Sequence, residues 1–145
     1  MFYNPVNLTD SQKLVYIRML IFLAKSDKNP NFIEKDFIKK IIARFQLNPA
    51  LMQNLTVPND FDDLPIVLQP INNYAVAVDL LHCLWFATSI DSKISDEEVR
   101  IIRCAAKILG IDDDTLLKIN DFVLDEIMFI ERTHEILKSS EIRFA

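Results

Sequence analysis

Glycine is almost absent from this chain of 145 residues, which contains only Gly110. Sheet proteins use glycine at tight turns and bulges, so its scarcity favours helices joined by ordinary loops. Half of the residues are hydrophobic, which argues against a disordered segment, and the length suits one domain with a buried core. We therefore predict an all-α fold, a helical bundle in a single domain.

Reactive cysteine patterns, secretory signals and membrane spans are also lacking. Cys83 and Cys104 lie in apolar helical runs without C-x-x-C spacing, which favours small core residues in a reducing compartment. No basic, apolar and small-residue succession opens the chain, so we expect a cytoplasmic protein. The apolar runs 14–24 and 75–90 are shorter than the roughly 20 residues of a spanning helix. The net charge of −5 argues against general nucleic-acid binding, which depends on neutralising phosphates.

Start and stop signals divide the chain into helices. Capping boxes, in which a cap side chain and a residue three positions later bond each other's backbone, are predicted at Thr9/Gln12, Asn31/Glu34 and Ser95/Glu98. Asn48-Pro49 suits a helix start, and Gly110 suits a left-handed helix end. The predicted helices cover about 10–26, 32–46, 71–90, 96–109 and 113–139, with a further helix that starts at Pro49 and with a break near Asp125 left open.

An internal repeat is the most informative feature of this pattern. A shift of 64 residues aligns Asp27 with Asp91 and Glu34 with Glu98, and no gap is needed over more than thirty positions. The apolar positions coincide as well, among them Ile17 with Leu81. We predict two helix-loop-helix units about a pseudo-twofold axis, with the nearly all-apolar first helix of each unit at the centre. The units cover about 10–55 and 71–120, separated by a linker at about 56–70 and followed by a C-terminal helix at about 121–140.

The loops of the two units carry a family resemblance. Their sequences are AKSDKNPNFIEKDF and TSIDSKISDEEVRII, and the second helix of unit two closes with ILGID. This pattern resembles the tellurite-resistance TerB family, although Lys28 and Ser92 stand where the family has a glycine after the loop aspartate. The resemblance covers about residues 14–122. It implies a helical bundle linked to tellurite and other chemical stress in bacteria, with acidic clusters and metal-ion association.

The repeated carboxylates Asp27, Glu34, Asp91 and Glu98 form the candidate metal site. Hard oxygen ligands suit calcium or magnesium, and pseudo-twofold symmetry could bring both copies together. The alternative is helix chemistry, because Glu34 and Glu98 occupy the third helical position, where a carboxylate bonds the cap amide and faces the positive helix end. An EF-hand is excluded, since the twelve-residue loops counted from either aspartate lack the required glycine and glutamate.

Two further groups of polar residues remain as candidates. His82 and Asp79 are three residues apart on one helix, and no nucleophile accompanies them, so we expect a hydrogen-bonded histidine at the rim of the core. Basic residues on the second helices define either solvated faces or a surface for an acidic partner or an anionic membrane surface. These residues are Lys39, Lys40, Arg44, Arg100, Arg103 and Lys107.

These observations favour a non-enzymatic interaction or sensing module in a bacterial stress response, with a protein partner and a link to divalent cations. One alternative is a small metal-dependent enzyme that uses the same four carboxylates. Another is a structural subunit whose surplus apolar residues form a homodimer seam; these residues are Phe122, Ile127, Met128 and Phe129.

Overall fold

The computed structural model describes residues 7–26, 32–90 and 94–144, with side chains described from 35 in the second helix and up to 139 in the last. All regular structure in these residues is helical, which confirms the all-α prediction. None of the described helices is both long and apolar enough to cross a membrane.

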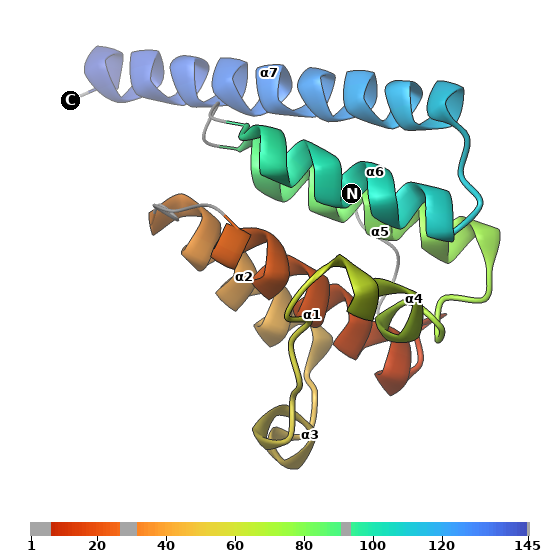
Figure 1. The fold of residues 1–145 in the computed structure, drawn as a ribbon. Coiled ribbons are helices and arrows are strands. Elements are labelled where there is room, and N and C mark those ends of the chain that lie inside the picture. Colours follow the sequence, from red (N-terminus) through yellow and green to blue (C-terminus); the bar gives the residue numbers. More distant parts are fainter. Residues whose placement is uncertain (1–6, 27–31, 91–93, 145) are drawn as a thin grey trace.

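Within the described residues, five longer helices form the body. They are α1 (Asp10–Ser26), α2 (Phe32–Phe45), α5 (Tyr74–Ser89), α6 (Asp96–Ile108) and α7 (Asp113–Phe144). In Figure 1, α5 lies between α7 and the α1–α2 hairpin, and α6 runs beside α5. The helices α1 and α5 carry most of the core, and repeat-equivalent Ile17 and Leu81 are both fully buried.

The ends of these helices follow the sequence signals. Thr9 and Gln12 bond each other's backbone amides, as do Ser95 and Glu98, so both capping boxes are confirmed. Each such cap stabilises a helix by about 1 kcal/mol. Gly110 adopts the left-handed conformation at φ 74°, in which a side chain would be strained, and ends the helical segment before α7. The predicted cap Asn31 lies outside the described residues.

The predicted linker at 56–70 is partly helical. It contains a 3-10 turn, η2 (Phe61–Asp63), and α4 (Leu64–Val67), whereas the short α3 (Pro49–Gln53) precedes it as predicted. Asp60 and Asp63 cap η2 reciprocally. Leu64 and Leu68 are buried. The prolines and aspartates therefore mark a capped turn that delivers two leucines to the core, so the segment predicted as the linker contains short helices of its own.

The last helix begins at Asp113, as predicted, and it is continuous through Asp125, where a break had been left open. The proposed unit boundary near residue 120 falls inside this helix. At 32 residues it is twice as long as α5, which has 16. A helix rises 1.5 Å per residue, so α7 is longer than α5 by roughly 24 Å. Figure 1 shows α7 continuing past the end of the α5–α6 hairpin.

Candidate interaction surface and the groove between α5 and α7

The predicted metal ligands are only partly within the described structure. Asp27 and Asp91 lie outside the described residues, and so does the side chain of Glu34. Glu98 is 1% exposed, and its carboxylate accepts a hydrogen bond from the Ser95 amide. In the described part of the chain, no three His, Cys, Asp or Glu side chains are grouped as metal ligands. Glu98 thus has the capping role that was its alternative, and binding of calcium or magnesium stays a prediction.

The six basic candidates are exposed on two different helices. Lys39, Lys40 and Arg44 lie on α2, and the other three, Arg100, Arg103 and Lys107, lie on α6. Lys40 pairs with Asp36 at 3.0 Å. Arg100 lies 4.8 Å from the ring centre of Phe61 and 3.9 Å from Glu97. An exposed ion pair of this kind contributes at most about 1 kcal/mol. Binding of an acidic partner to these residues stays a prediction.

His82 belongs to α5, and its side chain contacts α7. It is 7% exposed, and its Nε2 contacts a carboxylate oxygen of Glu126. The ring also meets Phe122 edge-on, with centroids 5.3 Å apart. Asp79 accepts a hydrogen bond from the Tyr16 hydroxyl at 2.5 Å, which ties α5 to α1. The expectation of a hydrogen-bonded histidine at the rim of the core is confirmed.

The partners of these two residues were not predicted. Tyr16 and Glu126 lie 63 and 44 residues away from Asp79 and His82 along the chain. The residues next to Tyr16 in the sequence give no sign of its contact with Asp79. One signal was present for Glu126. It lies on the same side of α7 as the buried residues Ile119 and Val123, and a glutamate on such a side indicates a polar partner.

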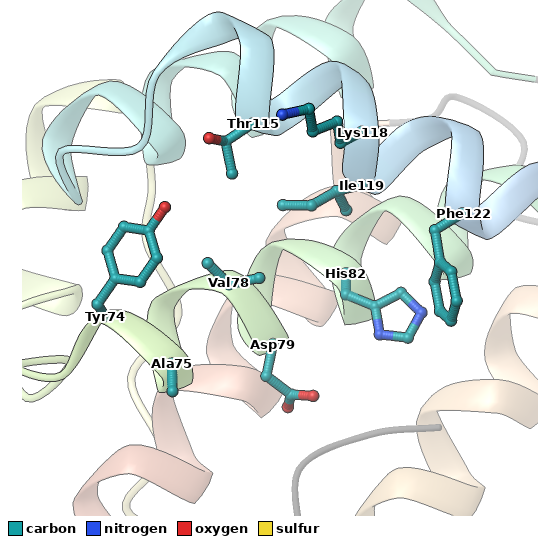
Figure 2. Close-up of a pocket in the computed structure, with 9 residues that line it drawn as sticks. All are labelled: Tyr74, Ala75, Val78, Asp79, His82, Thr115, Lys118, Ile119 and Phe122. Carbon is teal, nitrogen blue, oxygen red and sulfur yellow. The ribbon is translucent and has the colours of Figure 1, made fainter.

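A shallow apolar groove of about 590 Å³ runs beside this contact. Figure 2 shows its lining residues, which come from one side of α5 and the facing side of α7. Val78 and Ile119 lie at its centre, Tyr74 stands at one end, and His82 and Phe122 stand at the other. Its volume is within the range of small-molecule sites. Lys118 at its edge pairs with Asp114 at 3.2 Å.

The cysteine on α5 is a core group. Cys83 is fully buried, and this burial raises its pKa, as does the negative charge of Asp79, while Arg44 acts in the opposite direction. A thiol with a raised pKa holds little of the thiolate that acts as a nucleophile. Cys83 therefore matches the small core residue predicted from the sequence.

Large exposed apolar residues gather on α7. Phe122 is 56% exposed and Phe129 is 72% exposed. Together with three further exposed residues they form what we call the α7 apolar face, which consists of Phe122, Phe129, Ile130, Ile136 and Leu137. Phe122, Phe129 and Ile136 recur every seven residues and therefore share one side of the helix. Phe122 also lines the groove, so the groove and the face are continuous.

Comparison with known proteins identifies no relative: no family model, no curated protein and no solved structure matches this chain.

Proposed function

We propose that this chain is a TerB-like protein-interaction module without catalytic activity, and that the α7 apolar face is its docking surface. The observation that carries the proposal is the continuous exposure of large apolar side chains along a helix that extends past the bundle. Contiguous apolar patches on this scale mark interaction sites in water-soluble domains. A role in bacterial chemical stress belongs to the proposal and rests on the TerB resemblance.

The two hairpins α1–α2 and α5–α6 are, in this proposal, copies of one unit about a pseudo-twofold axis. The support is the sequence repeat together with the contact of α1 with α5, in which the equivalent residues Ile17 and Leu81 are both buried. On this interpretation the duplicated body is a rigid support, and α7 is the additional element that meets the partner.

The composition of α7 favours a protein partner over a lipid surface. Asp121, Asp125 and Glu131 are exposed on the same helix as the α7 apolar face. Helices that lie on anionic membranes carry basic residues on their polar side, because the lipid surface is negative. An acidic apolar helix is repelled there, whereas a protein can offer it complementary charges.

In-cell crosslinking tests the proposal with two variants, each of which replaces one exposed apolar residue of α7 by glutamate. Phe129→Glu places a charge on the α7 apolar face, and Leu117→Glu places one on an exposed leucine about 120° around the same helix. We expect Phe129→Glu to remove the crosslinked species of the wild-type chain and Leu117→Glu to retain them. Equal crosslinking of all three chains, with circular dichroism confirming their folding, would overturn the proposal.

A further inference from the structure

We propose that the partner on the α7 apolar face is a second copy of this chain, bound through α7 in an antiparallel arrangement. This inference rests on the proposed function, because it names the partner of the same surface. Three features carry it: the charges that border the face, the registry of its apolar residues with the groove, and the area that the face offers.

The charges along one edge of the α7 apolar face are self-complementary in only one direction. Asp125 and Arg132 are both exposed and lie seven residues apart on the same edge of the face. In an antiparallel pair of helices, residues of the same edge meet, so Asp125 of each copy lies beside Arg132 of the other. A parallel pair would place this edge of the two copies on opposite sides of the seam, so Asp125 of one copy would not meet Arg132 of the other.

The same register brings the apolar residues together. Setting Asp125 against Arg132 centres the pair between residues 128 and 129, so Phe129 lies near Phe129 of the second copy. It also places Ile136 of the second copy over Ile119 and Phe122, which line the groove. The exposed end of each α7 would therefore cover the groove between α5 and α7 in the other copy.

The α7 apolar face supplies more than half of the area that a stable dimer needs. Side chains of this size offer on the order of 150–250 Å² each, so the five partly exposed members of the face present roughly 500 Å². Tyr74, which is 63% exposed at the end of the groove, adds to this surface in the arrangement above. A stable interface of standard size needs about 800 Å² from each partner. The apolar face and its polar border together approach this size.

Sedimentation equilibrium of the full chain with charge variants tests the inference. We expect the wild-type chain to dimerise, and we expect Asp125→Arg and Arg132→Asp each to weaken dimerisation about tenfold or more. Both residues are exposed, so these changes leave the fold intact. Each variant alone has like charges in both contacts of its dimer. An equimolar mixture of the two variants has opposite charges in both contacts, and we expect it to dimerise like the wild-type chain.

The matched control is Glu131→Arg, which changes an exposed acidic residue on the side of α7 opposite Phe122 and Phe129 and should leave dimerisation unchanged. A wild-type chain that is monomeric up to about 1 mM would overturn the inference. A dimer that neither charge variant weakens, or a mixture that fails to recover dimerisation, would overturn it too. A monomer whose crosslinks still depend on Phe129 would contradict only the second copy as partner, and crosslinks that ignore Phe129 would contradict the proposed function itself.

Discussion

The two halves of α7 have similar apolar content but different surroundings. In the first half, Leu116, Ile119 and Val123 are buried against the body. In the second half, Phe129, Ile136 and Leu137 continue the apolar pattern and are mostly exposed. The difference arises because α5 ends at Ser89, whereas α7 continues beyond it.

This contrast shows that the length of a helix can define a surface as clearly as its composition does. A helix apolar enough to be buried is normally stabilised by the body that it packs against, because isolated helices are marginal in water. The second half of α7 has a helical sequence pattern without such packing among the described residues. It is therefore the region where binding of a partner would add most to stability.

A charged substitution in the packed first half of α7 should cause the largest loss of stability. Val123 is 0% exposed, so Val123→Asp would bury a carboxylate without a partner among the apolar residues of α5 and α7. We expect a loss of 4 kcal/mol or more, on the order of the largest single-substitution effects, in urea unfolding. A loss below about 1 kcal/mol would mean that the first half of α7 is not docked as described.

A smaller loss of stability is expected from breaking the contact between His82 and Glu126, which lies at the end of the packed half of α7. His82 and Glu126 are 9% and 16% exposed in their side chains, so removing one partner leaves the other with little access to water. We expect Glu126→Ala to lower the free energy of unfolding by about 1–3 kcal/mol.

A double-mutant cycle with His82→Ala measures the coupling between the two side chains. We expect the double variant to be more stable than the sum of the two single losses predicts, because the second substitution removes a group that the first had left unpaired. Additive losses would show that His82 and Glu126 act independently.

Local features of the fold could be predicted because short-range chemistry determines them. The caps at Thr9 and Ser95 and the left-handed Gly110 depend on residues within four positions, and all three occur as predicted. The central placement of α1 and α5 followed from their nearly all-apolar circumference. The possible break near Asp125, which the sequence left open, does not occur, because an exposed aspartate inside a helix costs only a few tenths of a kcal/mol.

The candidate site was less predictable because it depends on contacts between distant segments. The Tyr16 partner of Asp79 has no local signal, and the only signal for the Glu126 partner of His82 is a glutamate within an apolar helix face. The groove between α5 and α7 exists only once both helices are placed. The apolar surplus in Phe122, Met128 and Phe129 was visible in the sequence. Whether it faced the core or solvent depended on where α5 ends relative to α7.

The smallest effect is expected for an uncharged substitution in the exposed half. Phe129→Ser removes a ring that is 72% exposed, so little burial is lost within one chain. Measured in dilute protein, where self-association is absent, the free energy of unfolding should change by less than about 0.5 kcal/mol. At high concentration the same substitution should weaken dimerisation, since the ring then lies in the interface. A loss of several kcal/mol in dilute protein would show that Phe129 supports the fold of the single chain, and the two halves of α7 would then not differ as described.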